Sequence, residues 1–207
     1  SQPGDVIVDP FCGRGGSLLV GAALGRKCVG YDLSPQNLKT VASVALQHTP
    51  VDASDFVLHH SCGVELKEYE EQEDVFDLVT SDPPFLFGVE PYGNDPRDLC
   101  LIKDVDGYVA KMTTCLSNLK RLIKPSNFQT KEFHPIVMKV GSARRGEMGL
   151  IDIATELEII ARGLGLTLHD KIINVLDSQW GMFNVSRCID NRYAVKIHET
   201  NLVWVKY

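Results

Sequence analysis

The chain alternates short apolar runs, each the length of a β-strand, with longer amphipathic runs of helical periodicity. The strand-like runs lie at residues 5–11, 27–33, 55–61, 76–82, 134–142, 166–176 and 193–207, and the helical runs at 17–25, 34–48, 105–125 and 150–165. Strands joined by crossover helices return to one sheet in the same direction. The alternation therefore predicts an α/β fold with a mostly parallel seven-stranded sheet. No helical pattern separates the last two strands, so we expect the last strand to be antiparallel.

Length and composition favour one domain over residues 1–207. Of the 207 residues, 44% are hydrophobic and 23% are charged, which is ordinary for a chain with a sizeable core. No apolar run approaches the roughly 20 residues that span a membrane. The sequence begins four residues before the first strand-like run with no secretory signal, so we expect a piece of a longer protein that works in the cytoplasm or the nucleus.

The cysteines and histidines lack the spacing of metal ligands. None of the six cysteines forms a C-x-x-C pair, and several lie within apolar runs. They are typical of buried thiols in a reducing compartment, so we expect no metal site and no disulfide framework. The net charge of −6 argues against a surface that binds nucleic acid over its whole extent.

A glycine-rich turn, "DPFCGRGG", follows the first strand-like run. Ligands of open α/β sheets bind outside the carboxyl ends of the strands, which is where this turn lies. Gly13 and Gly15 allow backbone positions with positive φ and close approach of a ligand. The turn is not a P-loop, because no Gly-Lys-Ser/Thr follows, and Leu18 stands where G-x-G-x-x-G needs its third glycine.

Asp32 ends the second strand-like run, 17 residues after Gly15. A carboxylate at this position can accept hydrogen bonds from both hydroxyls of a ribose. The alternative is an acidic residue that stabilises the N-terminus of the following helix. Together with the glycine turn, Asp32 predicts a cofactor that carries adenosine.

Three stretches, "VDPFCGRGG", "GYDLSPQ" and "TSDPPF", resemble the S-adenosylmethionine-dependent methyltransferases that modify exocyclic amino groups. The likeness is greatest to the adenine-N6 and cytosine-N4 DNA methyltransferases, with cofactor motif D-P-F-x-G-x-G and catalytic motif D/N/S-P-P-Y/F/W. The ending "KIHETNLVWVKY" is similar to the family's last strands. The resemblance implies a Rossmann-like class I methyltransferase fold. In the branch with the D-P-F form the catalytic motif comes first, and here that order is reversed.

The resemblance also implies site residues and S-adenosylmethionine as the cofactor. The implied cofactor-binding residues are Asp9, Pro10, Phe11, Gly13, Gly15, Asp32, Leu33, Ser61 and Cys62. The implied catalytic residues are Asp82, Pro83, Pro84 and Phe85. The third strand ends in "HHSCG" where the family often has an acid, so Ser61 or the Cys62 backbone would take its place.

The Asp-Pro-Pro-Phe motif suits methyl transfer to an amine whose lone pair is delocalised into a base. The Asp82 carboxylate and the Pro83 carbonyl would accept the two amine hydrogens, and the prolines fix φ and so pre-organise that carbonyl. Phe85 would stack on the target base. The bland alternative is a proline turn that ends a strand.

Asp82 favours adenine in DNA as the substrate, because serine at this position is typical of the cytosine enzymes. A tRNA guanosine-N2 methyltransferase is the competing interpretation, although Leu86 and Phe87 separate Phe85 from Gly88 where those enzymes have D-P-P-Y-G. A non-catalytic methyltransferase-like subunit and a nucleotide-binding oxidoreductase remain as alternatives. With an acidic balance, we expect a partner subunit or an N-terminal region to supply most of the nucleic-acid affinity.

Overall fold

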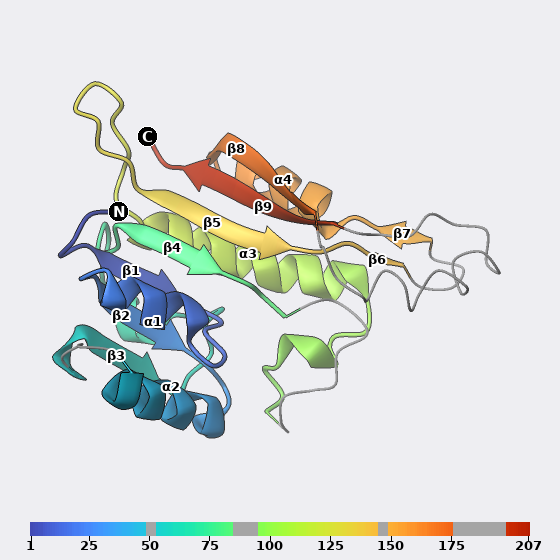
Figure 1. The fold of residues 1–207 in the computed structure, drawn as a ribbon. Coiled ribbons are helices and arrows are strands. Elements are labelled where there is room, and N and C mark those ends of the chain that lie inside the picture. The colour runs from blue at the N-terminus through green and yellow to red at the C-terminus, as the bar shows by residue number, and fades with distance from the viewer. Residues whose placement is uncertain (49–52, 85–94, 145–148, 176–197) are drawn as a thin grey trace.

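The computed structural model describes residues 1–48, 53–84, 95–144, 149–175 and 198–207. Its centre is a seven-stranded sheet in the order β3-β2-β1-β4-β5-β9-β8 (Figure 1). The strands are β1 (Val6–Asp9), β2 (Lys27–Tyr31), β3 (Phe56–His59), β4 (Leu78–Ser81), β5 (Pro135–Val140), β8 (Thr167–Val175) and β9 (His198–Val205). The first five pair in parallel, and β9 is antiparallel to both of its neighbours. The predicted sheet and its antiparallel last strand are confirmed.

Within the described residues, four α-helices cover the two faces of this sheet (Figure 1). The pair α1 (Gly16–Ala23) and α2 (Pro35–His48) lies over one face, and α3 (Val105–Leu122) and α4 (Ile153–Gly163) lie over the other. Strand order reverses between β1 and β4, because the chain first builds outward to β3 and then crosses back. Open α/β sheets bind ligands at the carboxyl ends of their strands beside such a reversal.

Sequence signals set the helix boundaries. The Ser34 hydroxyl accepts a hydrogen bond from the Asn37 amide at 3.3 Å, and serine is a residue type that commonly caps a helix in this way. Asp104 caps α3 in the same way, accepting from the Gly107 amide at 2.7 Å. Pro125, three residues beyond α3, cannot continue a helix.

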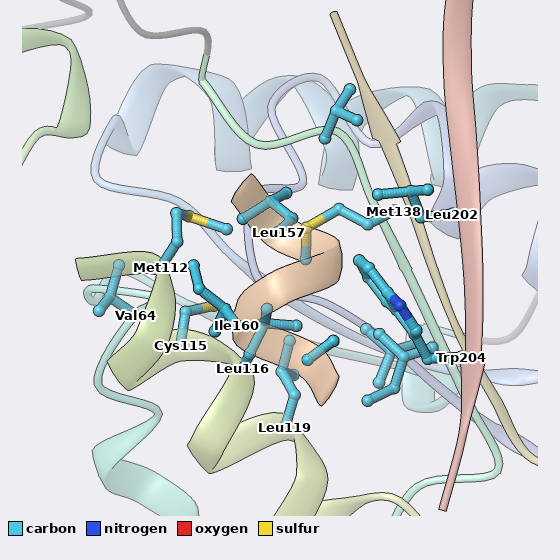
Figure 2. Packing of buried hydrophobic residues seen from close by; sticks show 14 of the residues in the cluster. Val64, Met112, Cys115, Leu116, Leu119, Met138, Leu157, Ile160, Leu202 and Trp204 are labelled. Carbon is cyan, nitrogen blue, oxygen red and sulfur yellow. The ribbon is translucent and has the colours of Figure 1, made fainter. Parts of the chain in front are cut away.

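The larger part of the core lies between α3, α4 and strands β4, β5 and β9. Trp204 of β9 is 1% exposed, and α3 presents a row of completely buried side chains. Burying each such side chain contributes about 1.5–3 kcal/mol. Figure 2 shows this packing through Val64, Met112, Cys115, Leu116, Leu119, Met138, Leu157, Ile160, Leu202 and Trp204.

A second, smaller cluster fills the other face beneath α1 and α2. Leu18 and Ala22 of α1 pack there with Leu38 of α2 and Cys28 of β2. Gly30 of β2 permits this close contact, since a Cβ at that position would lie 2.5 Å from the Leu18 Cδ1. The first helix is therefore packed tightly against β2, the strand that directly precedes Asp32.

The structure departs from the sequence prediction beside α4. We predicted a helix from residue 150, but Leu150–Ile151 form a short strand, β7, that pairs with β6 (Ala143–Arg144), and the helix begins at Ile153. Two-residue strands leave no periodic signal. Short 3₁₀ turns, also unpredicted, occur at Ala53–Asp55, Lys67–Tyr69 and Leu99–Leu101. Residues 193–197 of the last predicted strand lie outside the described residues. Within the described part of the chain, no helix has the length and apolar character needed to span a bilayer.

Candidate cofactor and catalytic cleft

A cleft of about 870 Å³ lies at the carboxyl ends of the strands on both sides of the reversal. That volume is within the roughly 300–1,000 Å³ of ligand pockets. The lining comes from the turn after β1, the ends of β2, β3 and β4, the segment at 95–99, and β5 and β9. The described lining residues on which the argument below depends are Asp9, Pro10, Phe11, Gly13, Ser17, Asp32, Leu33, Ser61, Cys62, Gly63, Asp82, Pro83, Pro84, Lys139 and Asn201.

Asp9 ends β1 and anchors the turn that follows it. Its side chain is buried, with the residue 4% exposed. One carboxylate oxygen accepts the Phe11 amide at 3.0 Å, and the other accepts the Ser17 hydroxyl at the start of α1. Burial raises the pKa of Asp9 from its ordinary 3.8 to about 6, although these hydrogen bonds lower it. The aspartate therefore holds strand, turn and helix together.

Two glycines let the turn after β1 adopt its shape, and a third lets the chain after β3 approach it. Gly13 and Gly15 have φ values of +52° and +78°, which favour glycine. A Cβ on Gly15 would also lie 2.6 Å from Cγ2 of Val41 on α2. At Gly63 a Cβ would lie 1.7 Å from the Pro10 carbonyl oxygen, so only glycine fits there.

Asp32 ties the glycine turn to the beginning of α2. Its Oδ2 accepts the Gly13 amide at 2.9 Å, and its Oδ1 accepts the Ser34 amide at 2.7 Å and the Asn37 side-chain amide at 3.1 Å. Asp32 thus serves the N-terminus of α2, as one of the two interpretations predicts, and it also lines the cleft, where its role toward a ribose stays a prediction. A carboxylate oxygen has two acceptor positions, and Gly13 takes one of those on Oδ2.

The end of β3 forms the next part of the wall through Ser61 and the buried Cys62. His60 precedes them, and its Nε2 lies 3.0 Å from the Leu33 carbonyl oxygen. Because a carbonyl only accepts, this nitrogen carries the proton. His60 thereby links the segment after β3 to the segment after Asp32, which is a structural role that its sequence position does not reveal.

The Asp82-Pro83-Pro84 turn leaves β4 directly into the cleft. Tyr108 of α3, which is 2% exposed, donates its hydroxyl to the Pro84 carbonyl at 3.1 Å. A hydrogen bond from α3 therefore holds the second proline of the turn in place. Phe85, the fourth predicted catalytic residue, lies outside the described residues.

Asp82 is paired with a lysine on the neighbouring strand. Lys139 of β5 places Nζ 2.6 Å from Oδ2 of Asp82, while the Asp82 side chain remains 46% exposed. Burial raises the pKa of Asp82 above its ordinary value, and the Lys139 ammonium acts in the opposite direction. The result is a carboxylate at the cleft with a cation on one of its oxygens.

The structure brings nearly all of the predicted site residues into this one cleft. Of the described ones, Gly15 alone is outside its lining and instead permits contact between the turn and α2. The sequence analysis assigned no contribution to Gly63, Tyr108 or Lys139. No group of three or more potential metal ligands occurs within the described residues.

Comparison with known sequences matches parts of this chain to proteins described as DNA and tRNA methyltransferases. Residues 1–43, which hold the Asp9 turn and Asp32, match the family model described as DNA methylase. The chain resembles the DNA methylases. This match confirms the resemblance that the motifs indicate, over the part of the chain that it covers.

Two curated relatives extend the comparison. The type II methyltransferase M.EcaI of Enterobacter cloacae is 49% identical over 41 residues, or 20% of this chain and 9% of its own length. A protein of Methanothermococcus thermolithotrophicus named "Probable tRNA (guanine(10)-N2)-dimethyltransferase" is 27% identical over 123 residues, or 57% of this chain and 75% of its own.

Solved structures show the fold. A SAM-dependent methyltransferase of Methanosarcina mazei superposes with a TM-score of 0.61 at 15% identity, covering 100% of this chain and 94% of its own. Magnesium protoporphyrin IX methyltransferase of Synechocystis, solved with bound SAM, gives a TM-score of 0.57 at 12% identity, covering 99% and 71%. The predicted Rossmann-like methyltransferase fold is confirmed.

Proposed function

We propose that the chain catalyses transfer of a methyl group from S-adenosylmethionine to an exocyclic amine of a nucleic-acid base. The observation that carries the proposal is the single cleft that joins the Asp9 turn and Asp32 to the Asp82-Pro83-Pro84 turn. A turn that merely ended β4 would not need a buried tyrosine and a lysine to hold it beside such a pocket.

The residues after β1 and β2 fit the adenosine and amino-acid parts of this cofactor. Asp32 keeps an acceptor position on Oδ2, beside its bond to Gly13, for a ribose hydroxyl. Leu33 and Cys62 offer apolar surface to a base, and the glycine turn permits close backbone approach. When bound, the cofactor supplies a methyl group on a positively charged sulfur.

Asp82 and Pro83 would prepare the amine. The Asp82 carboxylate and the Pro83 carbonyl accept one amine hydrogen each, which favours a tetrahedral nitrogen with its lone pair directed at the methyl group. Tyr108 keeps the backbone of this turn in place through Pro84. We propose that Phe85 stacks on the base, as its place in the motif suggests.

Adenine in DNA is the first substrate to test. The family model described as DNA methylase matches residues 1–43, and aspartate begins the catalytic motif. A guanine amine in tRNA is the second candidate, favoured by the 123-residue match to the tRNA methyltransferase. With a net charge of −6, we further propose that a partner subunit or another region of the full protein supplies nucleic-acid affinity.

The test is transfer of a labelled methyl group to DNA, tRNA and single-stranded RNA, followed by nucleoside analysis. The proposal predicts label on N6 of adenine in DNA, or on N2 of guanine if the tRNA alternative holds. An Asp82→Ala protein serves as the control for contaminating activity. Binding of S-adenosylmethionine without label on any base would contradict the proposal, and absence of binding would favour a non-catalytic subunit.

A further inference from the structure

Lys139 lies between two carboxylates contributed by the strands on either side of it. Its Nζ is 2.6 Å from Oδ2 of Asp82, at the end of β4, and 3.5 Å from Oε2 of Glu199 on β9. The order β4-β5-β9 places the three residues on adjacent strands, and Asp82 and Lys139 line the cleft. In the strand register Met138 pairs with Ser81, the residue before Asp82, and Lys139 pairs with Asn201, which is two residues from Glu199 on β9.

The groups that face Asp82 come from four elements, and some of them raise the pKa of Asp82 while another lowers it. Asp9 of β1 and Glu199 of β9 are carboxyl groups, and each, when ionised, disfavours a second negative charge nearby. Tyr108 of α3 carries a neutral hydroxyl, since burial raises its pKa far above neutrality. Among the described residues around Asp82, Lys139 is the cation that opposes these effects.

We propose that Lys139 is a positioning residue for the proposed methyl transfer: it holds Asp82 by Oδ2 as a carboxylate and leaves Oδ1 to accept a hydrogen of the target amine. Glu199 holds the lysine from the opposite side and moderates its effect. The inference rests on the proposed function for its catalytic meaning, while the pairing itself can be tested without any activity. A protonated Asp82 would offer a donor in place of an acceptor, and the amine would lose its alignment.

The arrangement predicts opposite effects for the two partners of Lys139. Removing the lysine charge raises the pKa of Asp82, because burial and the nearby carboxylates are then unopposed. Removing the Glu199 charge lowers the pKa of Asp82, because a negative neighbour is lost and the lysine remains. If activity needs the ionised Asp82, it should fall on the acid side of the pH profile. The pH at which it falls should be higher than in wild type for Lys139→Met and lower than in wild type for Glu199→Gln.

The first experiment titrates the Asp82 carboxyl by NMR in protein labelled with ¹³C at the aspartate side chains, with the resonance assigned through Asp82→Asn. The midpoint should move up in Lys139→Met, move down in Glu199→Gln and stay near wild type in Lys139→Arg. Lys171→Met is the matched control, because it breaks a lysine–glutamate pair with Glu158, and neither of those residues lines the cleft. An unchanged midpoint in Lys139→Met, or an equal shift in Lys171→Met, would overturn the proposal.

The second experiment measures kcat as a function of pH with the nucleic acid that the protein is found to methylate. Lys139→Met should lose roughly tenfold more activity at pH 6 than at pH 8, and Lys139→Arg should recover most of it. A loss that is uniform across pH means a merely structural role and overturns the proposal. Wild-type protein that methylates no substrate would instead refute the proposed function, and the NMR midpoints would then decide the lysine pairing independently.

Discussion

Two aspartates end neighbouring strands of the sheet and are held in contrasting ways. Asp9 of β1 is 4% exposed and gives its oxygens to the Phe11 amide and the Ser17 hydroxyl. Asp82 follows the adjacent strand β4, and its side chain is 46% exposed beside the Lys139 ammonium. At the same edge of the sheet, Asp9 thus stabilises a turn, whereas Asp82 faces the cleft.

The cause of the difference is what each strand leads into. β1 continues into a tight glycine turn and then α1. Phe11 in the turn and Ser17 in the helix supply local hydrogen-bond donors to Asp9. β4 continues into two prolines, which have no amide hydrogen to give, so Asp82 is satisfied from β5 instead. An aspartate without local donors remains available to a ligand, and this contrast is the basis of the division that we propose between cofactor binding and catalysis.

The largest expected effect concerns Asp82, the aspartate to which we assign the catalytic role. Asp82→Ala should lower kcat for methyl transfer by about 10²–10³-fold, because it removes an acceptor aimed at the reacting amine. The rate of label transfer under saturating cofactor measures this. Asp170→Ala, at an exposed aspartate on β8, is the control. Near-wild-type turnover in Asp82→Ala would mean that the turn is only structural.

The next effect tests the approach of the β3 segment to the β1 turn. Gly63→Ala should destabilise the protein by about 2–4 kcal/mol and weaken cofactor binding, because its Cβ would lie 1.7 Å from the Pro10 carbonyl oxygen. Denaturant unfolding gives the free energy. Gly163→Ala, at a helical glycine whose Cβ would meet nothing within 4 Å, should change it little. Equal effects of the two substitutions would refute the packing argument.

The third prediction concerns the pH dependence of the buried aspartate. Because burial raises the pKa of Asp9 from 3.8 to about 6, the native state holds this proton more tightly than the unfolded chain does. Its stabilising contribution is complete below about pH 4 and declines, by on the order of 3 kcal/mol, as pH rises through about 6. Asp9→Asn should lack this decline, so its unfolding free energy relative to wild type should improve from pH 4 to pH 7.

Denaturant unfolding at several pH values measures that difference. Asp106→Asn, at an exposed position in the first turn of α3, should follow the wild-type profile. Parallel profiles for Asp9→Asn and wild type would contradict the assignment of a buried aspartate that takes up a proton on folding.

The smallest effect tests the support of the catalytic turn. Tyr108→Phe removes the hydrogen bond to the Pro84 carbonyl and should cost about 1 kcal/mol of stability. We expect about a three- to tenfold loss in kcat, with little change in cofactor binding, because only the turn after β4 loosens. Unfolding and turnover measure the two effects, with the exposed Tyr207→Phe as control. An unaltered kcat would show that Tyr108 does not position the turn.

Local signals in the sequence predicted the strands, the principal helices and most of the cleft. Asp9, Asp32 and Asp82 each follow an apolar run, and the carboxyl ends of parallel strands converge at one edge. The contributions of Gly63, Tyr108 and Lys139 depend on contacts with residues 24 to 57 positions away in the chain. No spacing rule brings such pairs together. The short strand β7 escaped prediction because two residues within an amphipathic run look like part of the helix.

The central claim, that the β1 and β2 ends bind the cofactor and the β4 end performs the chemistry, is tested most directly by calorimetry. S-adenosylmethionine is titrated into wild type, Asp32→Ala and Asp82→Ala. The account predicts that Asp82→Ala binds within about threefold of wild type, since its side chain faces the amine, whereas Asp32→Ala loses at least about tenfold in affinity. Loss of binding in Asp82→Ala, together with full binding in Asp32→Ala, would contradict it.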